Sequence, residues 1–327
     1  MQPFSFVEAN SVSEALQAAG VSSATFFAGG TTLIDLMKID VMTPAQLVDV
    51  NRLPLSSIEE AQDGIIVGAN VRNSDLAHHP LVRERFPVLS EALLAGASAQ
   101  IRNMASTAGN LLQRTRCPYF RDVQSACNKR HPGSGCDALS GFNRSHAVLG
   151  TSSHCIAVHP SDMCVALMIL DAKISTQRRD GTTREIPLND FYLLPGDTPE
   201  RENVLEPGEL ITHVHVPNSD VAKRSHYLKV RDRASYEFAL ASAAVAIRTD
   251  GSRIVGAKVA LGGIATIPWR SREAEAALIN KPATHETFQA AAEVALADAK
   301  PQKHNAFKIP LAKHTFIAAL DELIHRG

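Results

Sequence analysis

A glycine-containing turn runs directly into a long cysteine-rich loop, and this stretch limits the possible fold and function of the chain more than any other. The stretch covers residues 99–136 and reads AQIRNMASTAGNLLQRTRCPYFRDVQSACNKRHPGSGC. The small residues around Gly109 are of the kind that lets a backbone approach a phosphate closely. The following segment is polar, rich in Gly and Pro, and carries Cys117, Cys127 and Cys136. Long loops inside compact domains are usually functional, so the stretch predicts two cofactor-binding features side by side.

A second glycine turn lies near the N-terminus. A short apolar strand, ATFF, leads into Ala28-Gly29-Gly30-Thr31-Thr32, and LIDLMK continues as a helix. Unpaired amides at the start of a helix favour an anion. The pattern is not the G-x-G-x-x-G fingerprint of a Rossmann fold, and two glycines can also simply permit a tight turn. Taken together, the turns at 28–32 and 106–110 suit the two phosphates of a dinucleotide.

Four of the five cysteines lie in sequence typical of loops, with the spacing Cys117-x9-Cys127-x8-Cys136-x18-Cys155. This spacing lacks the close pairs of a structural zinc site and the runs of common ferredoxins. An iron–sulfur cluster, zinc, a disulfide and unrelated thiols therefore all remain open from the spacing. The fifth, Cys164, sits in the apolar run SDMCVALMIL and is expected to be a buried structural thiol.

Length and composition bound the remaining possibilities. A chain of 327 residues is long enough for two or three units. Its net charge of −1 gives no reason to expect nucleic acid or an anionic membrane as partner. No apolar run approaches the roughly 18 residues of a membrane span. The N-terminus lacks the basic and apolar regions of a signal peptide, so any export would depend on a partner.

The second half of the chain predicts a separate α+β unit. The polar stretch after ELITHVHVP (209–217) is a plausible boundary. Beyond it, two strand-like runs flank Asp250-Gly251, a hairpin signal. Two helical patterns follow, at roughly 284–299 and 311–325. Strands followed by a run of helices favour an α+β domain.

Several long blocks then carry a resemblance to a known family. They are AGGTT-LIDLMK, VGANVRNSDL, IRNMASTAGNLLQRTRCPYFRD, HPSDM and YLKVRDRASYEFAL. These blocks resemble the FAD-binding medium subunit of the xanthine dehydrogenase family of molybdenum hydroxylases. Within that family they are most similar to the FAD and [4Fe-4S] subunit of the periplasmic aldehyde oxidoreductases. The resemblance runs from the first strand to the C-terminal helix.

The resemblance implies an α+β fold with a two-subdomain FAD-binding region of the vanillyl-alcohol-oxidase (PCMH) type. This region would span residues 1–218, divided into about 1–55 and 56–218, with the cysteine loop as an insertion at 113–156. Residues 222–327 would form an α+β C-terminal domain of the CO-dehydrogenase flavoprotein type.

The resemblance also implies the cofactor contacts. The segment matching residues 26–33 wraps the FAD pyrophosphate, and the block matching 106–110 supplies the second phosphate turn, with Ala108 in place of a family glycine. Asp162 matches a contact to the flavin nucleotide, and Lys229 matches a residue near the isoalloxazine. The full set of expected FAD contacts is Phe26, Phe27, Ala28, Gly29, Gly30, Thr31, Thr32, Leu33, Ser106, Thr107, Gly109, Asn110, Asp162 and Lys229.

Lys229 begins the run KVRDR, which by itself reads as a solvated charge run. It follows the apolar pair Tyr227-Leu228, so its ammonium is able to reach inward. A cation there would favour an anionic reduced flavin. The Tyr236 side chain is expected to lie beside the flavin, at an interface or in the hydrophobic core.

The cysteine loop resembles an insertion that binds a [4Fe-4S] cluster in this branch of the family. The cysteines that match its ligands are Cys117, Cys127, Cys136 and Cys155, and Cys164 has no counterpart. Nearby histidines are expected to be loop or supporting residues rather than ligands; they are His131, His146, His154 and His159.

The function implied is that of an electron-transfer flavoprotein subunit in a heterotrimeric molybdenum-dependent aldehyde oxidoreductase. A large molybdenum-cofactor partner would oxidise the aldehyde, and a small partner with [2Fe-2S] clusters would pass electrons to FAD here. FAD would then reduce an external acceptor, so no catalytic side chain is expected in this chain. The compartment would be the periplasm if a partner carries a twin-arginine signal, and otherwise the cytoplasm. The alternatives are a self-sufficient flavin oxidoreductase of the same fold and a non-enzymatic scaffold with a zinc loop.

Overall fold

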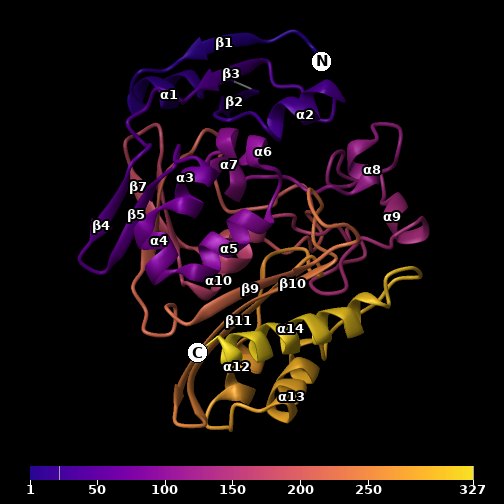
Figure 1. The fold of residues 1–327 in the computed structure, drawn as a ribbon. Coiled ribbons are helices and arrows are strands. Elements are labelled where there is room, and N and C mark those ends of the chain that lie inside the picture. The colour runs from indigo at the N-terminus through magenta and orange to yellow at the C-terminus, as the bar shows by residue number, and fades with distance from the viewer. Residues whose placement is uncertain (22, 327) are drawn as a thin grey trace.

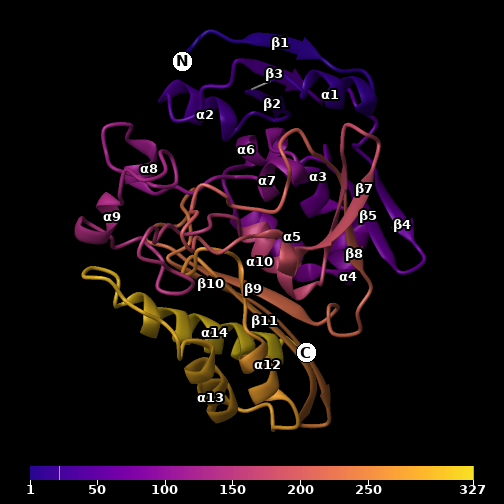
Figure 2. The same cartoon turned by 180° about the vertical axis from the view of Figure 1, so that it is seen from behind.

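Three β-sheets and the helices around them make up the computed structural model, which describes residues 1–21 and 23–326. The N-terminal sheet and the C-terminal sheet lie at opposite ends of the molecule, and the largest sheet lies between them (Figure 1; Figure 2). This mixture of helices and sheets confirms the expected α+β class. No described helix is both long and apolar enough to cross a membrane.

The N-terminal sheet is parallel and has the strand order β1-β3-β2. Its strands are β1 (Ser5–Glu8), β2 (Ala24–Phe27) and β3 (Gln46–Asp49), and they alternate with α1 (Val12–Ala18) and α2 (Leu33–Lys38). The sequence Ser11-Val12-Ser13-Glu14 has the pattern of a capping box, and Ser11 is the N-cap of α1. The Ser11 side chain accepts from the Glu14 amide at 3.2 Å, and the Glu14 carboxylate accepts from the Asn10 amide at 2.8 Å.

The central sheet is antiparallel and has the order β4-β5-β8-β6-β7. Its strands are β4 (Ile58–Ala61), β5 (Gly64–Gly68), β6 (Lys173–Gln177), β7 (Thr183–Pro187) and β8 (Leu210–Pro217). Its helices are α3 (Asn73–His78), α4 (Pro80–Arg85), α5 (Pro87–Ala95), α6 (Ala99–Met104), α7 (Thr107–Leu111), α10 (Asp162–Ile169) and α11 (Leu188–Phe191). Every residue of α10 after Asp162 is buried, as expected for a helix that is apolar on all sides.

The C-terminal sheet is antiparallel and has the order β12-β11-β10-β9. Its strands are β9 (Ser225–Val230), β10 (Ala241–Asp250), β11 (Arg253–Gly262) and β12 (Trp269–Arg270). Helices α12 (Arg272–Leu278) and α14 (Lys308–His325) pack on it directly, and α13 (His285–Ala295) packs on those two helices. Because α5 and α10 also contact its strands, this sheet connects the central region to the C-terminal helices.

The cysteine loop projects at one side of the molecule (Figure 1). Its only helices within the described chain are two short ones, α8 (Pro118–Arg121) and α9 (Asp137–Ser140). A single antiparallel bridge joins Cys127 to Cys136. Most of the loop therefore has no regular backbone pairing, as its composition predicts.

Candidate functional site

The Gly-Gly turn after β2 needs glycine for two different reasons. Gly30 has a φ of +68°, in the region that L side chains rarely adopt. A Cβ on Gly29 would lie 2.0 Å from the carbonyl oxygen of Met104. The first turn thus packs directly against the end of α6, two residues before the Ser106 turn. The two turns that the sequence singles out are neighbours in space.

The backbone amides of the first turn are open. Within the described residues, the amides of 29–33 donate no hydrogen bond to another protein group, whereas the Ile34 amide donates to Gly30 at 3.0 Å. Buried or half-buried amides normally have partners. This row of donors therefore provides a place for an anionic ligand, as a phosphate-binding turn requires.

The second turn differs from the first, because most of its backbone amides already donate hydrogen bonds within the protein. The Thr107 amide donates to Val71 at 2.9 Å and the Ala108 amide donates to Ala69 at 3.0 Å. The Gly109 amide donates to the Ser106 hydroxyl at 3.2 Å. The small residues of this turn therefore allow a ligand to approach the backbone closely, but the turn provides few free amide donors.

Two large cavities meet at these turns. One has an empty volume of about 1090 Å³ and extends from the first turn over apolar residues such as Val50 and Leu55. The other has about 1710 Å³ and extends toward Asp162 and Lys229. Thr31, Thr32 and Gly109 line both cavities. The open amides of the first turn thus lie where the cavities adjoin, which suits an elongated ligand with phosphates at its middle.

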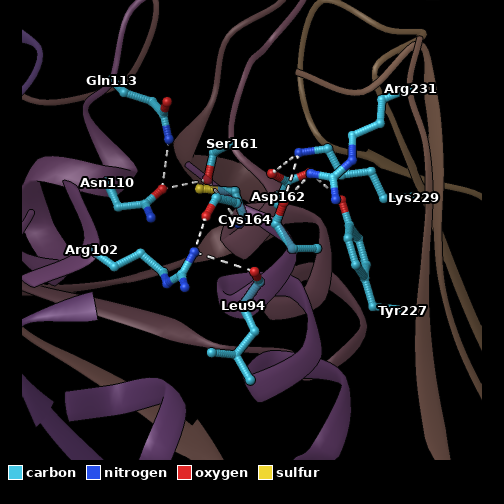
Figure 3. Close-up of polar contacts among 12 residues, drawn as sticks. Leu94, Arg102, Asn110, Gln113, Ser161, Asp162, Cys164, Tyr227, Lys229 and Arg231 are labelled. Carbon is cyan, nitrogen blue, oxygen red and sulfur yellow. Dashed lines mark hydrogen bonds and ion pairs between the residues drawn. The ribbon is translucent and has the colours of Figure 1, made fainter. Parts of the chain in front are cut away.

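An ion pair between Asp162 and Lys229 forms part of the wall of the larger cavity (Figure 3). The Lys229 ammonium lies 2.8 Å from the Asp162 carboxylate, and the side chains are only 3% and 10% exposed. The Tyr227 hydroxyl donates to the other Asp162 oxygen at 2.5 Å. Burial is the main reason that the pKa of Tyr227 is raised well above its usual value. Lys229 therefore reaches inward, as predicted, but its charge is already paired.

Hydrogen bonds to Asn110 Oδ1 connect the start of α10 to the second turn (Figure 3). Ser161 caps α10 by accepting from the Cys164 amide at 3.1 Å, and its hydroxyl donates to Asn110 Oδ1 at 2.7 Å. Gln113 donates to the same Asn110 oxygen at 2.7 Å. The positions of Asn110 and Asp162 in the cavity wall are therefore coupled.

The C-terminal end of α5 gathers three cations beside this wall. Arg102 donates to the carbonyls of 94 and 96, at 3.3 and 2.7 Å. Lys229 and Arg231 both donate to the carbonyl of residue 95, at 3.1 and 3.0 Å. Cations at a helix C-terminus interact favourably with its unpaired carbonyls and dipole, which holds these side chains in fixed positions.

The loop residues Cys117, Cys127, Cys136 and Cys155 line one small cavity. All four thiols are free, so the disulfide alternative does not apply here. Burial raises the pKa of Cys117 to about 12 and also raises those of Cys136 and Cys155. Thiols of this kind stay protonated until a metal displaces the proton.

The surroundings of this cavity supply hydrogen-bonding and charged groups. His146 Nε2 lies 3.1 Å from Cys117 Sγ, and burial lowers the pKa of His146 to about 4, so its ring is neutral at neutral pH. Lys129 also lines the cavity and pairs with Glu202 at 3.1 Å. Lys129 is thus a half-buried cation beside the thiols whose charge is partly balanced by Glu202.

The donor set can be tested against a single ion and against a cluster. Across 1–21 and 23–326, no three His, Cys, Asp or Glu side chains converge on a point where one metal ion would fit. Zinc requires its thiolates about 2.3 Å from one point, whereas cluster thiolates bind separate irons. The four cysteines therefore line one cavity without converging on a single-ion site among the described residues. Cys164 lies in the main core, 3.0 Å from the Tyr192 hydroxyl, and is the buried thiol predicted.

Comparison with known proteins decides the family. A family model described as the FAD binding domain in molybdopterin dehydrogenase matches residues 2–219. The chain belongs to this family. A second model, the CO dehydrogenase flavoprotein C-terminal domain, matches residues 226–323. The predicted resemblance and the predicted type of fold are both confirmed.

Relatives within the family cover nearly the whole chain. The aldehyde oxidoreductase FAD-binding subunit PaoB of Escherichia coli (strain K12) is 52% identical over 98% of both chains. The glyceraldehyde dehydrogenase medium chain of Sulfolobus acidocaldarius is 30% identical, over 85% of this chain and 82% of its own. A solved carbon monoxide dehydrogenase from Hydrogenophaga pseudoflava matches with a TM-score of 0.77 and 25% identity, over 99% of this chain and 98% of that one.

The structure brings most of the predicted site residues into two groups, at the two large cavities and at the cysteine cavity, whereas Phe27 and Thr107 line none of these cavities. It also adds residues that the sequence did not single out. Asn73 lines the larger cavity with its buried Oδ1 lacking a partner, within the described residues. Arg116 lies 5.1 Å from the Phe238 ring at the same cavity. Tyr236 also lines it and is 56% exposed, which rules out the core-packing alternative. Asn73, Arg116 and Phe238 all fall inside the blocks that carry the family resemblance, which was the available signal.

Proposed function

We propose that this chain is the FAD-carrying, electron-transfer subunit of a molybdenum-dependent aldehyde oxidoreductase. The 52% identity to the PaoB subunit over 98% of both chains supports this assignment. The observation that carries the FAD site is the row of open amides at 29–33, placed where the two large cavities adjoin. Bound FAD would supply the capacity to take up two electrons and to release them to an external acceptor.

In the proposed site, residues 26–33 and the Ser106 turn hold FAD between them. The amides of the first turn donate to the pyrophosphate, and Gly109 allows it to approach closely. The smaller, more apolar cavity takes the adenosine end, and the larger cavity takes the flavin end. The proposed contacts are Phe26, Phe27, Ala28, Gly29, Gly30, Thr31, Thr32, Leu33, Ser106, Thr107, Gly109, Asn110, Asp162 and Lys229.

Asp162 and Lys229 act in this proposal as a paired unit. A lone cation beside the ring would favour its anionic reduced form. The carboxylate at 2.8 Å balances most of that charge, so the pair acts as an oriented dipole. Their hydrogen bonds to Tyr227 and to the end of α5 fix this dipole in the cavity wall.

We further propose that Cys117, Cys127, Cys136 and Cys155 bind a [4Fe-4S] cluster. Support comes from their shared cavity, from the free state of the thiols and from the nearby Lys129. Iron–sulfur clusters are held by cysteine thiolates, and charge and hydrogen bonds around the sulfurs tune them. Zinc bound by the same loop is the competing outcome of the test below.

The proposed partners are a large molybdenum-cofactor subunit and a small [2Fe-2S] subunit. The aldehyde would be oxidised on the large partner, and no side chain of this chain would contact it. The periplasm is the proposed compartment if a partner carries a twin-arginine signal; otherwise it is the cytoplasm.

The proposed division of the chain is 1–218, with subdomains at about 1–55 and 56–218 and the insertion at 113–156, followed by 222–327. Each sheet draws its strands from a single one of these segments.

Purification of the chain together with the proteins that accompany it tests this proposal. The expected complex contains two further subunits, one FAD, and iron beyond that of its [2Fe-2S] clusters, and it oxidises aldehydes. Zinc in the cysteine loop without that extra iron would favour the scaffold alternative. Aldehyde oxidation by the isolated chain would favour the self-sufficient oxidoreductase.

A further inference from the structure

His146 is the side chain that contacts a cysteine of the loop most directly. Its Nε2 lies 3.1 Å from Cys117 Sγ. The residue is 2% exposed, and its ring faces Tyr119 of α8 at a centroid distance of 6.1 Å. A buried imidazole in contact with one sulfur of the cavity is placed to modify the charge on that sulfur.

The second ring nitrogen decides which atom carries the proton. His146 Nδ1 is buried and has no hydrogen-bond partner among the described residues. An orphaned buried N–H donor is rarer in proteins than an orphaned acceptor. The tautomer with the proton on Nε2 leaves only an acceptor unpaired. In that tautomer Nε2–H donates to Cys117 Sγ, since a thiolate accepts a hydrogen bond.

The peptide of His146 is held by the C-terminal domain. Its carbonyl accepts from Lys308 Nζ at 3.1 Å and from Asn305 Nδ2 at 3.2 Å. Lys308 Nζ also donates to the carbonyls of Ser145 and Gly263, at 3.0 and 2.6 Å, and Lys308 is fully buried. Both ribbon views place the segment before α14 beneath α9 (Figure 1; Figure 2). These donors fix the backbone from which the His146 side chain extends to the sulfur.

We propose that His146 is a positioning residue that donates a hydrogen bond to the Cys117 thiolate and raises the reduction potential of the cluster. This inference rests on the proposed [4Fe-4S] site. A reduced cluster carries one more negative charge than the oxidised one, so a donor to its sulfur stabilises the reduced form more. Removing the donor is therefore expected to make the potential more negative.

The test uses the purified complex and three variants of this chain. His146→Leu removes the donor, His146→Gln keeps an N–H near the same position, and His131→Leu changes an exposed histidine of the same loop. Iron and sulfide are measured first, and the cluster's midpoint potential is then determined by a redox titration followed by electron paramagnetic resonance. We expect a negative shift for His146→Leu, a smaller one for His146→Gln and none for His131→Leu.

Two outcomes separate this inference from the proposed function. A His146→Leu variant with full iron and an unchanged potential overturns the role of His146 and leaves the cluster proposal standing. A wild-type complex without the extra iron overturns both. If His146→Leu loses its cluster, the role of His146 is tested in the wild-type protein labelled with ¹⁵N-histidine. The spectrum of the reduced cluster should then show a weak coupling to a histidine nitrogen and to an exchangeable proton. Absence of that coupling overturns the inference.

Discussion

The Lys229 ammonium lies 2.8 Å from the Asp162 carboxylate, in a pair whose side chains are at most 10% exposed. Lys229 belongs to β9 and Asp162 opens α10, so the contact joins the C-terminal sheet to the central region. Desolvating two charges is costly, and leaving one of them alone is costlier. The pair is therefore a sensitive point in the wall of the proposed flavin cavity.

Replacing Lys229 by Met should destabilise the protein strongly. The change leaves the Asp162 carboxylate buried with only neutral partners, and breaking such a pair costs about 3–5 kcal/mol. The free energy of unfolding in urea measures this loss. Adding Asp162→Asn should restore part of it, because the isolated charge disappears. Lys223→Met, at an exposed position, is the matched control and should change stability by less than about 0.5 kcal/mol. Equal effects of the two lysine changes would refute the argument.

Replacing Gly29 by Ala should release FAD. The new Cβ would lie 2.0 Å from the Met104 carbonyl oxygen, so the two turns must move apart. We expect FAD affinity to fall about tenfold or more, equivalent to at least about 1.4 kcal/mol. Fluorescence titration of the flavin-free chain measures this affinity. Gly251→Ala, in a hairpin with nothing within 4 Å of the added Cβ, should bind FAD as the wild type does. A tight-binding Gly29→Ala variant would contradict the placement of the pyrophosphate.

Replacing Cys127 by Ser and replacing Cys164 by Ala should have different effects on the iron content of the protein. Cys127 lines the loop cavity, whereas Cys164 is packed in the main core. We expect Cys127→Ser to lose most of the loop iron. Cys164→Ala should keep it and lose stability instead, by about 1 kcal/mol, as is typical of a small core truncation. Iron analysis and urea unfolding measure the two effects. Full loop iron in Cys127→Ser would remove this residue from the ligand set.

Stability should fall in mild acid because of His159. Burial lowers the pKa of His159 to about 3, against an ordinary value near 6.5. Between these values the unfolded chain binds a proton that the folded chain does not. Stability is therefore fully present above about pH 6.5 and declines as pH falls, by up to about 1.4 kcal/mol per pH unit for this residue.

Urea unfolding of His159→Gln measures that contribution. The variant should lose stability less steeply than the wild type between about pH 6.5 and pH 5, since glutamine takes up no proton in either the folded or the unfolded chain. His314→Gln, at an exposed position, should follow the wild-type curve. Parallel curves for wild type and His159→Gln would show that this proton is not linked to unfolding.

Local patterns predicted the parts of the fold in which neighbouring residues decide the structure. The Ser11 cap, the turn at Gly29-Gly30 and the hairpin at Asp250-Gly251 are all set by cap or turn chemistry within a few residues. The last helix begins at Lys308, three residues before the predicted start. Pro310 lies in its first turn, where proline is tolerated.

Long-range contacts determine what the sequence did not predict. Lys229 was expected to reach inward, but the run after Tyr227 gave no sign that it lies in β9 and pairs with Asp162, 67 residues away. The second turn looked like a donor of amides, but carbonyls of Val71 and Ala69 already accept them. Neither partner is visible in the local pattern, and each changes the chemistry expected of the site.

The contacts of Asn305 and Lys308 with the His146 carbonyl also bear on the order of events during synthesis. The two partners of that carbonyl are 159 and 162 residues further along the chain. Most of the C-terminal domain must therefore leave the ribosome before this part of the cysteine loop can be held in place. Insertion of a cofactor into the loop would then be a late step, performed on a completed chain, and a C-terminal truncation would impair maturation of a site more than a hundred residues upstream.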